Sequence, residues 1–207
     1  MCGLRTPEAV QIACRLGVAY IGLNFYSPSP RSVTPPEAAA LAGHVTPGVA
    51  KVGLVVNPTD AELDALLAQV PLDMIQLHGA ETPGRVAEVK ARTGLPVIKA
   101  VGLRGPEDLP TLDSHLKVAD QILVDAKPAP ADTLPGGNGV AFDWRLIAGR
   151  RWPVPWLLAG GLTAANVAEA IRLTGARQID LSSGVETAAG VKDARLMEAF
   201  MAAVAAA

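Results

Sequence analysis

The chain has 207 residues, of which 50% are hydrophobic, and its 18 Lys and Arg residues nearly balance 20 Asp and Glu residues to give a formal net charge of −2. This length is enough for one well-buried core and short for two, so we expect a single domain over residues 1–207. The mixed charges, and the lack of a long uncharged apolar run or a secretory signal, argue against nucleic-acid and membrane partners and predict a cytoplasmic protein.

The predicted elements alternate between helices with an N-terminal cap and short, nearly continuous apolar runs, which are typical of strands covered on both faces of a parallel sheet. In chain order they are a helix from Thr6-Pro7 to Gly17, a strand over 19–25, a helix from Thr34-Pro35, a strand over 51–56, a helix capped by Asp60, a strand over 74–77, a helix from Thr82-Pro83 to Gly94, a strand over 97–101, a helix from Gly105-Pro106, strands over 121–124 and 156–159, a helix capped by Thr163, a strand over 178–181 and a helix capped by Asp193.

This order predicts an α/β fold, a (β/α)₈ TIM barrel. Seven predicted strands are each followed by a helix or a helix-like segment, and Cys2-Gly3 stands where an eighth strand would end, so strand 1 is truncated at the N-terminus. A doubly wound open sheet is the alternative fold. It would more naturally carry a Gly-x-Gly-x-x-Gly turn after an early strand, and the sequence has none.

The active site of such a barrel lies at the carboxyl ends of its strands, which singles out Cys2, His78 and Asp125. Asp125 ends the run "QILVD" and can act at the mouth of the barrel, cap a helix or pair with Lys127. A thiol at Cys2 can act as a base if its pKa is lowered. His78 has no second ligand at metal spacing, so we expect it to orient its neighbours or the substrate.

The remaining histidines and the second cysteine have simpler interpretations. His44 and His115 lie on predicted helices away from the strand ends and are expected to be solvated. Cys14 follows Val10 by four residues in an apolar helical stripe and is expected in the core. Two cysteines are too few for a disulfide framework and fit a reducing compartment.

Two loops near the C-terminus predict a phosphate site. "AGGLTAANV" contains Gly160 and Gly161, and "DLSSGVE" contains Ser182, Ser183 and Gly184. Glycines let backbone N–H groups approach an oxyanion, and the last two loops of a barrel commonly hold phosphate, whereas the alternative is a pair of tight turns.

An ordered set of motifs resembles the phosphoribosylanthranilate isomerase family over the whole chain. The motifs are "CGLRTPEAV", "IGLNFYSPSPRSV", "VGLVVN", "IQLHGAE", "IKAVG", "LVDAK", "GGNGVAFDW", "LAGGLTAANV" and "IDLSSGVETAAGVKD". The resemblance implies a (β/α)₈ barrel in tryptophan biosynthesis that converts N-(5-phosphoribosyl)anthranilate to 1-(2-carboxyphenylamino)-1-deoxyribulose 5-phosphate by an Amadori rearrangement. It implies no cofactor, no metal and a monomer or homodimer.

The resemblance also implies roles for individual residues. Asp125 would be the general acid that opens the ribose ring, with a pKa raised by desolvation, and Cys2 the general base that removes the C2 proton, with a thiol made more ionisable. Arg31 would hold the anthranilate carboxylate, and Asp180 would lie near the substrate. Gly160, Gly161, Ser182, Ser183 and Gly184 would form the phosphate loops.

Two features of the sequence need their own explanation. The glycines of "PGGNG", residues 135–139, permit positive φ angles in a loop that could close over the site as a lid. Family members usually carry several residues before the cysteine, whereas here only Met1 precedes Cys2, through a start codon placed too far downstream, a shortened chain or a genuine variant.

Other functions remain as alternatives at this point. A ribulose-phosphate epimerase would need paired histidines and aspartates around a metal, and an indoleglycerol-phosphate synthase would need lysines and glutamates at several strand ends. A barrel that binds the phosphoribosyl ligand without converting it is a non-enzymatic alternative.

Overall fold

The computed structural model describes residues 1–128, 134, 136, 137 and 139–207. Six strands form one parallel sheet in which each strand pairs with the next one along the chain. They are β1 (Tyr20–Asn24), β2 (Ala50–Val55), β3 (Met74–Leu77), β4 (Val97–Leu103), β5 (Gln121–Ala126) and β6 (Trp156–Leu158).

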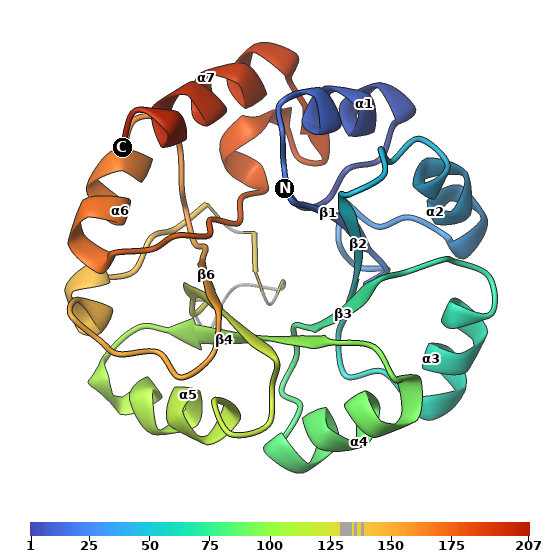
Figure 1. Cartoon of the computed structure of the whole chain (residues 1–207), viewed down its shortest axis with the longest axis horizontal. Coiled ribbons are helices and arrows are strands. Elements are labelled where there is room, and N and C mark those ends of the chain that lie inside the picture. The colour runs from blue at the N-terminus through green and yellow to red at the C-terminus, as the bar shows by residue number, and fades with distance from the viewer. Residues whose placement is uncertain (129–133, 135, 138) are drawn as a thin grey trace.

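In the described part of the chain, seven α-helices surround the strands (Figure 1). Figure 1 looks along the strands, with the sheet curving around the centre and α1 to α7 following one another around the rim. The helices are α1 (Pro7–Arg15), α2 (Pro35–Ala42), α3 (Asp60–Leu67), α4 (Pro83–Thr93), α5 (Leu109–His115), α6 (Val167–Thr174) and α7 (Ala194–Ala205).

Short elements complete the described chain. The 3₁₀ turns are η1 (Pro106–Asp108), η2 (Trp144–Ile147) and η3 (Ser183–Val185), and β7 (Glu186–Ala188) pairs antiparallel with β8 (Val191–Lys192) in a separate hairpin. No helix in the described part of the chain is long and apolar enough to cross a membrane.

Two further segments lie between the edges of the sheet. Ile179 bridges Leu158 of β6, Cys2 bridges Gly22 of β1, and the Cys2 amide donates to the Leu181 carbonyl at 2.9 Å. The predicted strand over 178–181 is therefore wrong as a regular strand, because β6 offers only three residues to pair with it. The described elements form a six-stranded parallel sheet, with single bridges where two further strands were predicted.

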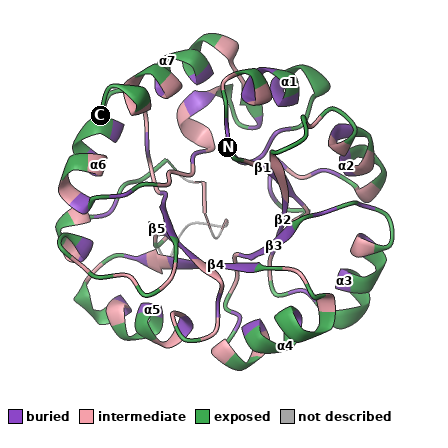
Figure 2. Cartoon of the chain, viewed as in Figure 1, coloured by how far each residue is buried: buried purple, intermediate pink, exposed green. Residues whose placement is uncertain are grey.

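The apolar side chains divide into two clusters because successive residues of a strand point to opposite faces of the sheet. One cluster fills the space enclosed by the strands and includes Val52, Met74, Ile98 and Leu123. The other, larger cluster lies between the strands and the helices, and its members include Phe200 of α7. Figure 2 shows the same division, with buried residues on the strands and the inner faces of the helices.

Local sequence explains most helix starts. Thr6, Thr34, Thr82 and Asp193 each accept a backbone N–H with the side chain, as predicted. Gly94 ends α4 with φ +67°, as predicted, because a left-handed residue satisfies the last carbonyls. The predicted helix from Gly105-Pro106 begins as the 3₁₀ turn η1 and continues as α5.

Two of the predicted helix caps are wrong. Thr59 caps α3, not Asp60, because its hydroxyl accepts the Glu62 amide in a capping box. Asn166 is the N-cap of α6, not Thr163, because its carboxamide bonds the Thr163 amide and the Gly161 carbonyl and so makes a turn before the helix.

His115 is buried, not solvated, whereas His44 is exposed as predicted. His115 follows Leu112 by three residues, so both side chains lie on the inward face of α5. Burial lowers the pKa of His115 and favours the neutral ring.

We expect Thr59→Ala to lower the free energy of unfolding by about 1 kcal/mol, because α3 loses its capping hydroxyl. Asp60→Asn removes only ion pairs with Arg85 and Arg92 at a carboxylate that is 48% exposed, so it should cost less. Urea unfolding of the two variants measures the difference. A larger loss for Asp60→Asn would contradict the assignment of Thr59 as the cap.

Candidate active site

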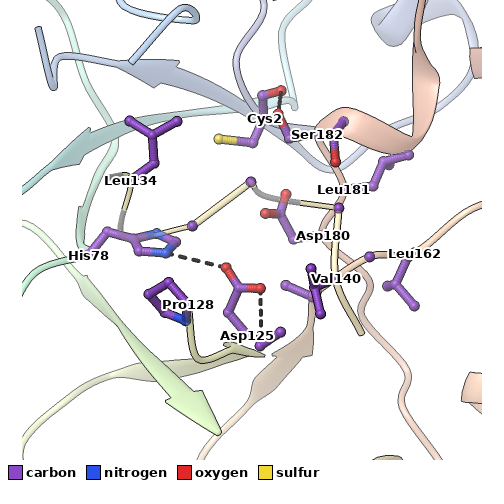
Figure 3. Close-up of a pocket in the computed structure, with 18 of the residues that line it drawn as sticks. Cys2, His78, Asp125, Pro128, Leu134, Val140, Leu162, Asp180, Leu181 and Ser182 are labelled. Atoms are coloured by element: carbon purple, nitrogen blue, oxygen red, sulfur yellow. Dashed lines mark hydrogen bonds and ion pairs between the residues drawn. The ribbon is translucent and has the colours of Figure 1, made fainter. Parts of the chain in front are cut away.

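A cavity of about 330 Å³ opens at the carboxyl ends of the parallel strands. Every site residue predicted from the sequence lines it: Cys2, Arg31, His78, Asp125, Gly160, Gly161, Asp180, Ser182, Ser183 and Gly184. Figure 3 shows Cys2, His78, Asp125 and Asp180 pointing into the same space from different segments. The fold therefore brings together residues that are up to 182 positions apart.

Asp125 is 7% exposed and lies at the end of β5, on the same strand face as the enclosed Leu123. Its Oδ2 is 3.4 Å from Nε2 of His78, and its Oδ1 accepts the Ala126 amide at 2.8 Å. It neither caps a helix nor pairs with Lys127, which instead contacts Asp108. Asp125 thus presents a carboxyl group to the cavity.

His78 is held by a residue that the sequence did not single out. Gln76, on the same strand face and 4% exposed, lies with its Nε2 2.9 Å from Nδ1 of His78. When Gln76 donates to Nδ1, the neutral ring carries its proton on Nε2 and directs it at Asp125. His78 thus contacts Asp125 directly, and its positioning role stays a prediction.

Cys2 is 7% exposed and packs against Gly22 of β1. A Cβ at Gly22 would lie 2.8 Å from the Cys2 Sγ, so only glycine leaves room for the thiol. Burial raises the pKa of Cys2 to about 12, and the nearby Asp180 adds to the rise. The expectation of a more ionisable thiol is wrong in this structure, because desolvation outweighs the attraction of the cations around it.

Asp180 lies between the segments that carry the other charged groups. Its carboxylate is 3.9 Å from the N-terminal nitrogen of Met1, and burial raises its pKa. Asp180 is thus a partly buried carboxyl group, with a side chain 17% exposed and a reduced tendency to ionise.

Arg31 is 6% exposed and enters the cavity from the loop after β1. Its Nε and Nη2 donate to the two carboxylate oxygens of Glu186 at 2.9 and 2.8 Å. Lys192 donates to Glu186 at 2.7 Å and to the Ser182 carbonyl at 2.9 Å. Arg31 is therefore a buried arginine held by ion pairing with Glu186 and not an exposed surface side chain.

The glycines of the two C-terminal loops allow close backbone approach. Gly160 has φ +87°, and a Cβ there would lie 2.7 Å from the Ala126 amide nitrogen; a Cβ at Gly184 would lie 2.0 Å from the Leu162 carbonyl oxygen. Among the described residues, the amides of Gly161, Ser183 and Gly184 have no hydrogen-bond acceptor. These N–H groups can donate hydrogen bonds to an anion at the rim of the cavity.

The "PGGNG" loop borders the same cavity. Pro135 and Asn138 of the segment proposed as a lid lie outside the described residues, as do residues 129–133 before it. Gly136 and Gly137 are described. A Cβ at Gly136 would lie 2.6 Å from His78 Nε2, and a Cβ at Gly137 would lie 2.7 Å from Arg31 Nη1. These two glycines therefore pass directly over the charged groups of the site.

Glu186, Lys192 and Gln76 are the charged and polar neighbours that sequence reasoning missed. The motif "DLSSGVETAAGVKD" contains the first two, but the sequence pattern alone assigned them no role. For Glu186 and Lys192 the signal is Gly190. It has φ +80° in the turn of the β7–β8 hairpin, which places these two residues opposite each other. Within the described residues, no group of three or more His, Cys, Asp or Glu side chains could hold a metal ion.

Comparisons with known proteins agree with this geometry. The family model for N-(5'-phosphoribosyl)anthranilate (PRA) isomerase matches residues 1–203. The N-(5'-phosphoribosyl)anthranilate isomerase of Paracoccus denitrificans (strain Pd 1222) is 61% identical over 202 residues, which cover 98% of this chain and 94% of that protein.

Solved structures give the same result. A phosphoribosyl anthranilate isomerase in complex with reduced 1-(o-carboxyphenylamino)-1-deoxyribulose 5-phosphate superposes with a TM-score of 0.86 at 28% identity, over 100% of this chain and 97% of that one. Monomers made from the dimeric isomerase of Thermotoga maritima superpose with a TM-score of 0.85 at 29% identity, over 100% and 97% of the two chains. The fold is therefore of the TIM-barrel type.

We expect iodoacetamide at pH 8 to modify Cys2 more slowly than the half-buried Cys14. With a pKa of about 12, only about one Cys2 thiol in 10⁴ is ionised at that pH, and the thiolate is the reactive form. Peptide mass spectrometry over time measures both rates, with a Cys14→Ala variant to confirm the assignment. Faster modification of Cys2 would show that its thiol is activated.

Proposed function

The chain belongs to the N-(5'-phosphoribosyl)anthranilate isomerase family, and from this premise we propose how its residues carry out the reaction. The chain isomerises phosphoribosylanthranilate in tryptophan biosynthesis. The observation that supports the residue assignment is the placement of a carboxyl group, Asp125, and a thiol, Cys2, in one cavity. An acid and a base are the two groups that an Amadori rearrangement needs.

A closed eight-stranded barrel is part of this proposal. The Cys2 segment and residues 178–182 stand between β1 and β6, and the hydrogen bond from Cys2 to Leu181 joins them. They supply the places of the first and eighth strands, each shortened to a bridge. We also propose that residues 1–207 form one domain, and either a monomer or a homodimer is consistent with a dimeric relative.

The two ends of the substrate have matching groups in the cavity. Arg31 binds the anthranilate carboxylate through the guanidinium edge that does not contact Glu186. The amides of Gly161, Ser183 and Gly184 bind the phosphate, with Gly160 and Ser182 shaping the loops. Substrate held at both ends has its ribose between Cys2 and Asp125.

Asp125 acts first, as the general acid. It gives its proton to the ribose ring oxygen, the bond from C1 to that oxygen breaks, and the anthranilate nitrogen lone pair forms a C=N bond. The product is an open-chain protonated Schiff base. His78 keeps the donating carboxyl group aimed at the ring oxygen, since its Nε2 contacts the other carboxyl oxygen of Asp125.

Cys2 acts second, as the general base. Its high pKa means that the thiol ionises only when positive charge arrives, and the protonated Schiff base supplies that charge one carbon from C2. The partly buried carboxylate of Asp180 is the neighbour that can take the thiol proton. The thiolate removes the C2 proton, and the resulting enolamine gains a proton at C1 and loses one from the C2 hydroxyl to give the ketone.

We expect Cys2→Ala and Asp125→Ala each to lower kcat by about 10²- to 10⁴-fold, because each removes one proton-transfer group. The measurement generates phosphoribosylanthranilate in situ and follows the decay of its fluorescence. Cys14→Ala is the matched control and should keep the parent rate, since Cys14 lies outside the cavity.

A Cys2→Ala variant as fast as the parent would remove Cys2 from the mechanism. A parent chain that binds the reduced product analogue but does not turn over the substrate would instead indicate a binding protein. Binding and turnover measured on the same preparation separate these two outcomes.

We expect Gly136→Ala to lower kcat by about tenfold or more, because the added methyl group would lie 2.6 Å from His78 Nε2 and 2.8 Å from Asp125 Oδ2 and would separate them. Gly84→Ala is a matched control, since neither position has positive φ and the atom nearest to the added Cβ at Gly84, Thr82 Oγ1, is 3.8 Å away. Equal kinetics for the two variants would show that the approach of the loop to Asp125 has no catalytic importance.

A further inference from the structure

Glu186 is a buried carboxylate with an unusually complete set of partners. Its side chain is 4% exposed. Oε1 accepts Arg31 Nε at 2.9 Å and Lys192 Nζ at 2.7 Å, and Oε2 accepts Arg31 Nη2 at 2.8 Å and the Gly190 amide at 3.2 Å. Four donors, three of them on cations, satisfy both oxygens and hold the carboxylate charged, so the pKa of Glu186 is low although it is buried.

The contact with Glu186 uses one edge of the Arg31 guanidinium. Nη2 makes a further contact with the Gly137 carbonyl at 3.3 Å, and Nη1 has no acceptor among the described residues. A Cβ on Gly137 would lie 2.7 Å from Nη1, so this end of the guanidinium reaches the loop over the cavity. The free edge of Arg31 thus faces the space where a ligand carboxylate would lie.

Lys192 connects the Glu186 carboxylate to the segment that carries Cys2. Its side chain is 2% exposed, and Nζ donates to the carbonyl and the hydroxyl of Ser182 at 2.9 and 3.1 Å. The Ser182 hydroxyl donates to the Cys2 carbonyl at 3.2 Å. Burial raises the pKa of Cys2, and the positive charge of Lys192 offsets part of that rise. Burial lowers the pKa of Lys192, and its contact with Glu186 offsets part of that fall.

The β7–β8 hairpin builds this arrangement. Glu186 and Lys192 are cross-strand partners, so the hairpin places their side chains side by side. Gly190 in its turn packs on the loop that carries Arg31, since a Cβ there would lie 2.5 Å from the Pro30 carbonyl oxygen. The hairpin therefore docks against the Arg31 loop in one register.

We infer that Glu186 is a positioning residue of the active site: it fixes the Nε and Nη2 edge of Arg31, so that the opposite edge meets the anthranilate carboxylate, and it holds Lys192 beside the Cys2 segment. The inference rests on the proposed role of Arg31 in substrate binding. It adds a residue that touches neither the substrate nor the reacting atoms.

The test compares two ligands that differ only in the group that Arg31 would bind. One is reduced 1-(o-carboxyphenylamino)-1-deoxyribulose 5-phosphate, and the other is the same molecule without the ring carboxylate. Glu186→Gln keeps the size of the side chain and removes its charge. We expect it to weaken binding of the carboxylated ligand by about tenfold or more, and binding of the other ligand by less than about twofold.

Titration calorimetry gives both dissociation constants, and Glu198→Gln, on an exposed face of α7, is the matched control. A double-mutant cycle with Arg31→Ala adds a second readout. If Glu186 acts through Arg31, Glu186→Gln should have little further effect on the carboxylated ligand once Arg31 is alanine.

Equal weakening for both ligands would overturn the inference, because a merely structural residue would affect the whole cavity. If Glu186→Gln does not fold, as judged by circular dichroism, Glu186→Asp keeps the charge one carbon shorter and should show a smaller loss confined to the carboxylated ligand; a loss for both ligands would again overturn it. A parent chain that discriminates the ligands but lacks turnover would count against the isomerase mechanism and leave the role of Glu186 intact.

Discussion

The parallel pairing of successive strands is the constraint on which the site depends. Because the six strands of the sheet run the same way, their carboxyl ends meet at one rim. Side chains two residues apart on a strand share one face. Asp125 therefore continues the enclosed row that begins with Leu123, and His78 continues the row of Met74 and Gln76. The short bridges of Cys2 and Ile179 add the remaining groups to the same rim.

Burial at this rim sets the charge of each group, and the outcome depends on its partners. Cys2 stays protonated because desolvation and the nearby Asp180 outweigh the cations around it, whereas Glu186 accepts three hydrogen bonds from cations and stays charged. In the proposed mechanism, a thiol of this kind becomes a base only when the substrate provides positive charge, so the acid step precedes the base step.

Local sequence was sufficient for most of the helix and strand starts, because the physical causes lie within a few residues. Thr34 and Glu37 form their capping box across three positions, and the left-handed Gly94 ends its own helix. At Thr59-Asp60 two polar residues compete, and the spacing alone does not decide which side chain reaches the free amides. At Thr163 and Asn166 the predicted cap is again the wrong residue, and Asn166 caps α6 without a side-chain hydrogen bond to the helix.

The sequence by itself predicted that parallel strands alternate with helices and that Cys2, Asp125 and Arg31 line one cavity, and the structure confirms both; the chemical roles of these three residues stay proposals. Only the tertiary structure decided which charges meet. Glu186 and Arg31 are 155 residues apart, and His115 is buried because its helix face turns inward. Desolvation of Cys2 likewise depends on segments from both ends of the chain, since it sums over every neighbour that replaces water, and no local pattern records that sum.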